Sequence, residues 1–375
     1  MLVGVPKEIK DSEFRVGLVP STVRELTLKG HHVLIEKDAG GGAGLADEAY
    51  VAAGAEIAVN VDRIFAEAEL IVKVKEPLAP ERKKLRHGQV LFTYLHLAPD
   101  REQAEDLLAS GCIAIAYETV TSPQGGLPLL MPMSEVAGRM APQAGAHCLE
   151  KEIGGRGVLL GGVPGVSAAR VVVLGGGVAG TNAARVAMGM EAHVTVIDKQ
   201  LARLYALDLQ FGSQLHTLFS TVENIEREVV GADLVIGAAL VAGAATPKLV
   251  TRDMVKRMRT GSVIVDISID QGGCCETSRP TTHADPTYVE DGVIHYCVTN
   301  MPGAVARTST FALNNATLPF VLALAQKGWQ RALADDRNLM AGLNIQAGRI
   351  THPAVAQSLD VAYLAPERAA GPTGG

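Results

Sequence analysis

The segment 170–198 constrains the fold of this chain more than any other stretch of its sequence. An apolar run leads into the pattern Gly175-x-Gly177-x-x-Gly180, a helical pattern follows, and a second apolar run ends in Asp198, 23 positions after the first glycine. Glycines at this spacing can also form a purely structural turn. The order of the pieces, however, predicts a dinucleotide-binding βαβ unit, because a strand, the glycines, a helix, a second strand and an acidic residue follow one another.

Each residue of this pattern has its own expected task. Gly175 permits the tight turn from strand to helix, and Gly180 lets the helix pack closely on the strand. Gly177 lets the backbone approach a pyrophosphate, which the N–H groups at the start of the helix would bind. A carboxylate at Asp198 can accept hydrogen bonds from both ribose hydroxyls and would repel a 2′-phosphate. NAD is therefore expected rather than NADP, although basic side chains follow closely.

The chain has 375 residues, which is long for one hydrophobic core and favours two domains. Apolar runs alternate with helical patterns on both sides of the glycines, so we expect an α/β protein of two Rossmann-like, doubly wound domains. The NAD-binding domain is predicted at 131–306. The substrate domain is predicted to be discontinuous, with residues 1–130 and 307–375, because a long apolar helical pattern interrupted by Pro319 returns the chain to it.

Charged or titratable residues follow three of the strands that the first domain is expected to contain. They are Arg15, Lys75 and His96. In open α/β sheets, ligands bind outside the carboxyl ends of the strands. Each residue alone has an ordinary explanation, as a solvated cation or a hydrogen-bonded histidine, but their shared edge of the sheet indicates a substrate site.

The second domain contains further candidate segments. The small residues 238–247 could let a nicotinamide-ribose approach, or they could form an ordinary loop. Asp270, after an apolar strand, could face the reacting centre or cap a turn before Gly272. Ser134 is expected to cap a helix that Pro142 bends.

Composition argues against several classes of protein. A net charge of −6 gives no basic footprint for nucleic acid. No apolar segment reaches about 18 residues, and the chain does not open on a signal-peptide pattern, so no membrane association is expected. The five cysteines are odd in number and lack CxxC spacing, which favours a reducing, cytoplasmic setting. No HExxH or Cys/His cluster occurs, so no metal site is expected.

These pieces together resemble bacterial alanine dehydrogenase, a relative of the NAD-binding part of proton-translocating transhydrogenase. The resemblance spans almost the whole chain, from Gly4-Val-Pro-Lys-Glu-Ile and Arg15-Val-Gly-Leu-Val-Pro to Asn300-Met-Pro-Gly-Ala-Val. Three motifs are similar to the dehydrogenase branch in particular: Lys75-Glu-Pro, Tyr94-Leu-His96-Leu-Ala and Asp266-Ile-Ser-Ile-Asp270-Gln-Gly-Gly.

The resemblance implies substrate binding by Arg15 and Lys75, and a catalytic pair of His96 and Asp270. It also implies a homohexamer and NAD as the cofactor. Beyond the three glycines and Asp198, the implied cofactor contacts are Ser134, Val178, Ala179, Arg203, Ser220, Ala239, Leu240, Ile267, Ser268, Ile269, Asp270, Arg279, Val298, Thr299, Asn300 and Met301.

The activity that the resemblance implies is NAD-dependent, reversible oxidative deamination of L-alanine to pyruvate and ammonia. Two other functions stay open. One is the NAD-binding subunit of a proton-translocating transhydrogenase, against which Lys75 and His96 count. The other is a non-enzymatic nucleotide-sensing protein, in which the residues at the sheet edge are merely structural.

Overall fold

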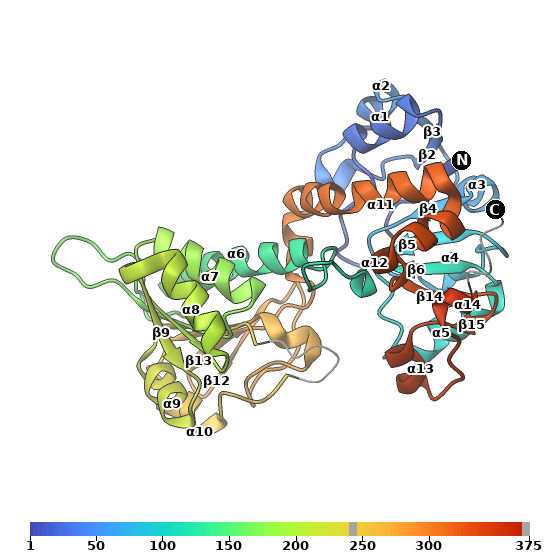
Figure 1. Cartoon of the computed structure of the whole chain (residues 1–375). Helices are drawn as coiled ribbons and strands as arrows, with labels where there is room; N and C mark the ends of the chain where they lie inside the picture. The colour runs from blue at the N-terminus through green and yellow to red at the C-terminus, as the bar shows by residue number, and fades with distance from the viewer. Residues whose placement is uncertain (240–245, 370–375) are drawn as a thin grey trace. The chain divides into compact units, whose positions relative to one another are not determined.

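The computed structural model describes residues 1–239 and 246–369. The chain forms two compact units: Met1–Met133 together with the chain from Val305 onward, and Ser134–Ala304 (Figure 1). The chain passes from the first unit to the second inside helix α6 (Met131–Cys148) and returns at the short helix η6 (Met301–Val305).

Unit 1 contains an eight-stranded sheet in the order β15-β14-β6-β5-β4-β1-β2-β3. Strands β1 to β6 are parallel and follow the 3-2-1-4-5-6 order of a doubly wound fold, whereas β14 is antiparallel to β6. Every residue of β4, β5 and β6 is buried, as expected for parallel strands covered on both faces. The strands are β1 (Leu2–Val5), β2 (His32–Glu36), β3 (Glu56–Ala58), β4 (Leu70–Val72), β5 (Val90–Thr93), β6 (Ile113–Ala116), β14 (Leu343–Gln346) and β15 (Arg349–Ile350).

The helices of unit 1 lie between these strands in the chain and after unit 2. They are α1 (Pro20–Leu28), α2 (Asp47–Ala52), α3 (Val61–Glu67), α4 (Ala79–Arg82), α5 (Arg101–Ser110), α11 (Ala306–Asp335), α12 (Arg337–Met340), α13 (Pro353–Leu359) and α14 (Pro366–Ala369), with the short helices η1 (Gly41–Ala43) and η2 (Tyr117–Thr119).

Unit 2 repeats the same strand order around the glycine motif. Its seven-stranded sheet runs β12-β13-β11-β10-β7-β8-β9, and only β12 is antiparallel to its neighbour. The two doubly wound sheets confirm the predicted fold class. The strands are β7 (Arg170–Leu174), β8 (His193–Asp198), β9 (Leu215–Phe219), β10 (Leu234–Gly237), β11 (Val263–Asp266), β12 (Thr287–Glu290) and β13 (Val293–Tyr296).

The helices of unit 2 after α6 pack around this sheet. They are α7 (Val178–Gly189), α8 (Leu201–Phe211), α9 (Val222–Gly231) and α10 (Arg252–Arg257), with the short helices η3 (Lys151–Ile153), η4 (Gly212–Gln214) and η5 (Ile267–Gln271).

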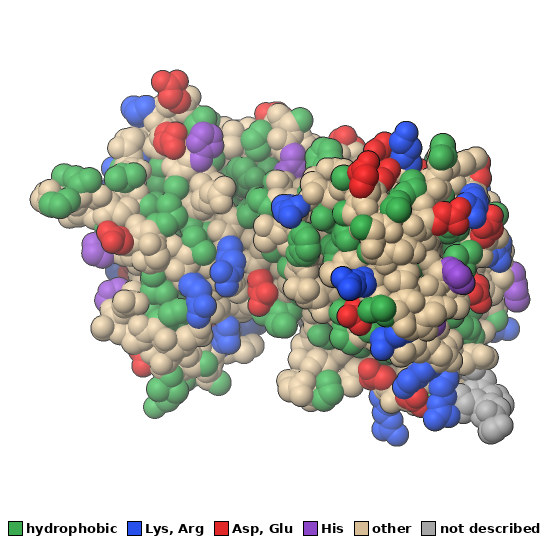
Figure 2. All heavy atoms as spheres, turned by 90° about the horizontal axis from the view of Figure 1, so that it is seen from above, with side chains coloured by type: hydrophobic (Ala, Val, Ile, Leu, Met, Phe, Trp, Pro, Cys, Tyr) green, Lys and Arg blue, Asp and Glu red, His purple; other side chains and the backbone are tan. Residues whose placement is uncertain are grey.

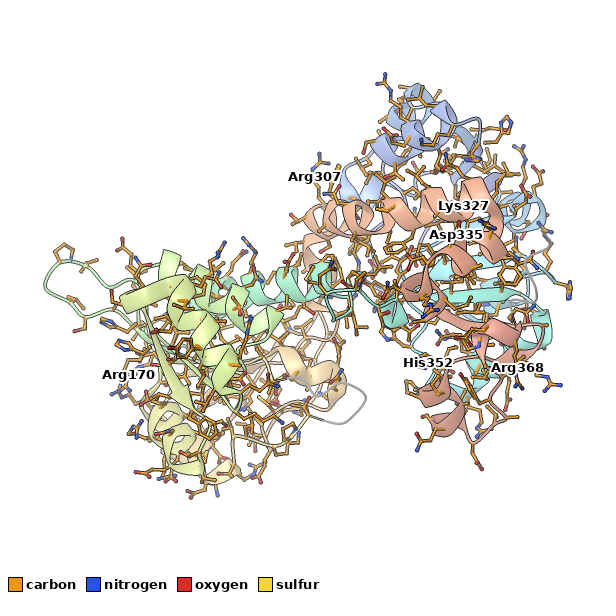
Figure 3. All side chains as sticks on the ribbon, viewed as in Figure 1. Arg170, Arg307, Lys327, Asp335, His352 and Arg368 are labelled. Atoms are coloured by element: carbon orange, nitrogen blue, oxygen red, sulfur yellow. The ribbon has the colours of Figure 1, made fainter. Side chains whose placement is uncertain are left out.

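The start of one helix and the interruption of another differ from the sequence prediction. Helix α6 begins at Met131, so Ser134 lies inside its first turns and is not its cap. Pro132 is the reason, because proline is favoured in the first turn of a helix. Helix α11 continues through Pro319 and is interrupted instead at Gly328, whose φ of 72° is not helical. Lys327 and Asp335 flank this interruption and form an ion pair of 2.8 Å (Figure 3).

The surface gives two observations that bear on function. In the part of the chain that the structure describes, no helix combines the length and the apolar character needed to cross a membrane. On the face drawn in Figure 2, acidic and basic side chains are interspersed and do not separate into a single charged patch.

Candidate functional site

Arg15 lies in the segment between β1 and α1, and the residue is only 2% exposed. Its Nε and Nη2 donate to the two carboxylate oxygens of Glu13 at 2.7 and 2.6 Å, and its Nη1 contacts Met133 Sδ at 3.0 Å. Burial opposes the charge of Arg15, but the hydrogen bonds and the negative charge of Glu13, with smaller contributions from Tyr94 and Glu8, together raise its pKa. Glu13 thus fixes the edge of the guanidinium formed by Nε and Nη2.

Lys75 follows β4 at the same edge of the sheet. Burial, and then the charge of Arg15, lower the pKa of Lys75. Glu8 stabilises the loop that carries Lys75. Its carboxylate accepts a hydrogen bond from the backbone N–H of Val74 at 2.7 Å and pairs with the fully buried Lys73 at 3.1 Å. A second carboxylate, Glu81, completes this buried set at 2.7 Å from the Lys73 ammonium.

His96 follows β5, and unlike its neighbours its side chain is exposed. Its φ of 50° lies in the left-handed region. Glu118, after β6, accepts hydrogen bonds from the backbone N–H groups of His96 at 2.6 Å and Leu95 at 3.2 Å. The imidazole also stacks on Tyr94, with ring centroids 5.8 Å apart. Because β1, β4 and β5 are adjacent parallel strands, Arg15, Lys75 and His96 all follow strands at the same edge of the sheet of unit 1.

The glycine loop of unit 2 joins β7 to α7. Gly175 has a φ of 102°, and a Cβ there would lie 2.8 Å from the carbonyl oxygen of Ala238. A Cβ on Gly180 would lie 1.8 Å from the carbonyl oxygen of Gly175 and 3.2 Å from Val173 of β7. A Cβ on Gly177 would meet nothing within 4 Å, so this residue faces open space at the N-cap of α7. That open space beside unpaired helix N–H groups fits a pyrophosphate.

Asp198 and Arg203 are both tied to the glycine loop. Asp198 accepts hydrogen bonds from the backbone N–H groups of Gly176 at 2.7 Å and Gln200 at 2.8 Å. Arg203 donates through Nε to the carbonyl oxygen of Gly176 and through Nη2 to the hydroxyl of Thr181, the latter at 2.6 Å. The carboxylate therefore stands where β8 ends, next to the loop that would hold the phosphates.

Most other predicted cofactor contacts lie at the carboxyl ends of the parallel strands. Ser220 follows β9, Ala239 follows β10, residues 267–270 follow β11 in η5, and residues 298–301 follow β13. Ser268 links two of these segments, because its hydroxyl donates to the carbonyl oxygen of Ala239 at 2.6 Å. Asp270 is exposed on η5.

The remaining cofactor positions have separate locations. Ser134 lies one turn before Gly138, whose absent Cβ lets α6 approach the backbone of Ala179 at the start of α7. Val178 is the first residue of α7. Arg279 lies over the ring of Tyr288, with its guanidinium carbon 3.9 Å from the ring centroid. Leu240 lies outside the described residues.

A surface hollow of about 440 Å³ lies elsewhere in unit 2. It is lined by residues of β7, β8, β9 and α9, among them Arg170, His193, His216 and Arg227 (Figure 3 labels Arg170). Arg170 and His193 begin their strands, so this hollow opens near the amino ends of the sheet. Ligands of doubly wound folds bind at the opposite end, and we therefore do not assign it to the cofactor.

Sequence reasoning missed the carboxylates that hold these side chains. Glu8, Glu13 and Glu118 each position a segment that carries a predicted residue. Glu118 could have been found, because it follows an apolar strand just as Lys75 and His96 do. Glu13 and Glu8 carried no such signal, since an acid near a basic residue in a loop is usually a solvated side chain.

The fold and these residues define a class: dehydrogenases built of two doubly wound units, one of them with a glycine loop for a dinucleotide. Family models for the alanine dehydrogenase/PNT N-terminal and C-terminal domains match residues 4–137 and 141–353. An alanine dehydrogenase of Halomonas elongata is 60% identical over 364 residues, which cover 97% of this chain and 98% of the relative. The chain belongs to the alanine dehydrogenase/PNT family.

Two solved structures extend the comparison. An L-alanine dehydrogenase has a TM-score of 0.94 and 54% identity, covering 96% of this chain and 99% of that one. A transhydrogenase from Sinorhizobium meliloti has a TM-score of 0.80 and 25% identity, covering 94% of this chain and all of that one. The chain is thus much more similar in sequence to the dehydrogenase than to the transhydrogenase.

Proposed function

We propose that this chain catalyses the reversible oxidative deamination of L-alanine with NAD: alanine, NAD⁺ and water give pyruvate, ammonium, NADH and a proton. The observation that carries the proposal is the grouping of Arg15, Lys75 and His96 at one sheet edge, in a chain 60% identical to an alanine dehydrogenase. These three side chains are the types that a 2-amino or 2-oxo acid requires.

The second unit is proposed to hold the cofactor. Gly177 and the first N–H groups of α7 would receive the pyrophosphate, and Asp198 would accept hydrogen bonds from the ribose hydroxyls. Bound NAD supplies the acceptor for the hydride that leaves the substrate's α-carbon. Asp198 already accepts from Gly176, so its position would be set before the cofactor arrives.

The first unit is proposed to hold the substrate. The guanidinium of Arg15, which Glu13 holds in place, would bind the carboxylate. The ammonium of Lys75 would donate to the carbonyl oxygen of pyruvate and stabilise the charge that develops there. Its burial strengthens that interaction, because a hydrogen bond to a charged donor gains strength where water is excluded.

His96 and Asp270 are proposed to complete the chemistry, and they belong to different units. The imidazole of His96 would take a proton from the water that adds to the imine and return a proton to the departing amine. The carboxylate of Asp270 would hold the amino group of the substrate or of the carbinolamine. Pyruvate and ammonium then leave as separate products.

One assay separates this proposal from the alternatives. Purified protein with L-alanine and NAD should produce NADH, measured by absorbance, and should oxidise NADH with pyruvate and ammonium. A transhydrogenase subunit would instead need a second nucleotide and no amino acid, and a nucleotide sensor would bind NAD without turnover. Absence of NADH formation with alanine, in protein that binds NAD, would contradict the proposed reaction.

Two properties of the family accompany the proposal. We propose that the chain assembles into a homohexamer and acts in the cytoplasm. Light scattering should then give a mass about six times that of the 39.3 kDa chain. A monomeric mass in active protein would refute the hexamer without affecting the proposed reaction.

A further inference from the structure

Three buried ligand-type side chains meet where β11 ends in unit 2. They are Asp266, Cys274 and Cys275, and among the described residues their ligand atoms all lie within 4.8 Å of one another. None of the three is exposed to solvent. The two thiols belong to adjacent residues yet point the same way, with 3.9 Å between their sulfur atoms. Adjacent cysteines are not a usual zinc-ligand spacing, so no sequence pattern indicates this group.

The spacing of the sulfur atoms matches that of two ligands on one ion. Two sulfurs that are each about 2.3 Å from a tetrahedral zinc ion are about 3.8 Å apart. The backbone is also shaped to admit the thiols. Gly237, at the end of β10, has no Cβ, and one placed there would lie 2.4 Å from the Cys274 sulfur and 2.9 Å from Asp266.

The surroundings add a third thiol and a positive charge. Burial, and then Asp266 and more weakly Cys275, raise the pKa of Cys297 to about 12, so Cys297 belongs to the same neighbourhood. The ammonium of Lys248 donates to the carbonyl oxygens of Gly272, Gly273 and Cys275 at 2.6, 3.0 and 3.0 Å. A divalent cation bound by two thiolates and one carboxylate would carry a net charge of −1, which this ammonium would offset.

We propose that Asp266, Cys274 and Cys275 form a binding site for a thiophilic divalent cation of the zinc and cadmium type. Such ions are bound in proteins by thiolate, imidazole and carboxylate ligands. The two cysteines would bind the ion as thiolates, so its affinity should rise with pH.

Occupation of the site would act on the loop that carries Asp270. Asp266 is the N-cap of η5, and its carboxylate accepts hydrogen bonds from Ser268 N at 3.1 Å, Cys274 N at 2.9 Å and the Ser278 hydroxyl at 2.6 Å. A cation would compete with these donors and alter η5. This consequence rests on the proposed function, and we expect the bound cation to slow alanine oxidation.

The experiment uses the full-length, reduced protein, with and without NAD, titrated with Cd²⁺. We expect one Cd²⁺ per chain and ultraviolet charge-transfer absorption from cadmium thiolate. Cys275→Ser should weaken binding at least about 100-fold, the upper end of the loss from changing a metal site's outer partners. Cys112→Ser is the matched control, since Cys112 is equally buried but lies in unit 1, and it should bind like the wild type.

X-ray absorption at the cadmium edge of the wild type tests the site without any variant and should show two sulfur neighbours. Lack of binding, oxygen neighbours only, or unchanged binding by Cys275→Ser would each overturn the site. These readouts do not depend on turnover, so they remain decisive if the protein fails to oxidise alanine. Separately, saturating Cd²⁺ should inhibit the wild type and Cys112→Ser but not Cys275→Ser. Binding without inhibition would contradict the link to Asp270.

Discussion

His96 is held in a backbone conformation that a histidine adopts at a cost. Its φ of 50° lies in the left-handed region, where a residue other than glycine loses about 1 kcal/mol or more. Two backbone N–H groups bound to Glu118 and the stacking on Tyr94 maintain it. With this backbone conformation the imidazole of His96 is exposed, although the neighbouring residues Leu95 and Leu97 are buried.

We expect His96→Ala to remove most of the turnover. Positioned acid–base catalysis contributes roughly 10²–10⁴-fold, and alanine cannot move the protons of water addition and amine loss. The kcat of alanine oxidation should fall by that factor, while NADH binding, measured by fluorescence titration, should stay unchanged. His32→Ala is a suitable control because His32 is exposed at the start of β2. Wild-type turnover by folded His96→Ala would contradict the catalytic role.

Lys75 gives a prediction about pH. Burial, and then Arg15, lower its pKa from the usual 10.5, and the proposed role needs the protonated form. Activity should therefore be retained below the lowered pKa and lost as the pH rises through it, at a lower pH than an exposed lysine would show. The measurement is the alkaline limb of kcat/KM for pyruvate reduction. A limb that begins only above pH 10.5 would contradict the assignment.

At the scale of elements, helix α7 contains a test of cofactor binding that leaves the fold intact. A Cβ at Gly177 meets no atom within 4 Å, so Gly177→Ala should fold normally. The methyl group would nevertheless stand where the pyrophosphate is proposed to lie, and NAD affinity should fall at least tenfold. Gly189→Ala, at the other end of the same helix and equally unobstructed, should bind NAD as the wild type does. Equal affinities of the two variants would refute the phosphate assignment.

Glu118 connects the ends of β5 and β6, and it acts through His96. We expect Glu118→Gln to lower kcat several-fold with little change in KM, since an amide oxygen accepts from the same N–H groups less strongly than a carboxylate. Glu118→Ala should lower kcat further. A purely structural role would reduce thermal stability in both variants and leave the kcat of the folded protein unchanged, which thermal unfolding and active-site titration can distinguish.

The strands were predictable because most of them are buried on both faces. The apolar run before Gly175 and the run that ends in Asp198 coincide with β7 and β8, since a buried parallel strand is a continuous apolar run between polar turns. The short edge strands β3 and β15 lack that signal and were not predicted. Arg15, Lys75 and His96 could be predicted from the rule that ligands bind at the carboxyl ends of strands. The roles of Glu8 and Glu13 could not, because they depend on side-chain contacts that no local sequence pattern encodes.

At the scale of the whole molecule, the proposed substrate residues other than Asp270 lie in one unit, and the proposed cofactor residues lie in the other. Arg15, Lys75 and His96 lie in unit 1, whereas the glycine loop and Asp198 lie in unit 2. Each unit has its own sheet and its own hydrophobic core. A substitution at Arg15, Lys75 or His96 should therefore leave the binding of NAD alone unchanged. A substitution in the glycine loop or at Asp198 should weaken it.

This division of tasks makes a paired prediction for Arg15→Lys and Asp198→Ala. Lysine is the better replacement for Arg15, because alanine would remove the cation that pairs with the buried Glu13 carboxylate, at a cost of several kcal/mol. Arg15→Lys loses the planar fork, so we expect KM for alanine and pyruvate to rise about tenfold or more, with NADH affinity unchanged. Asp198→Ala should weaken NAD binding and raise the affinity for NADP relative to NAD. Fluorescence titration with each nucleotide in the absence of substrate measures both effects. Weaker NADH binding by Arg15→Lys, or an unchanged nucleotide preference in Asp198→Ala, would show that the ligands are not divided between the units as proposed.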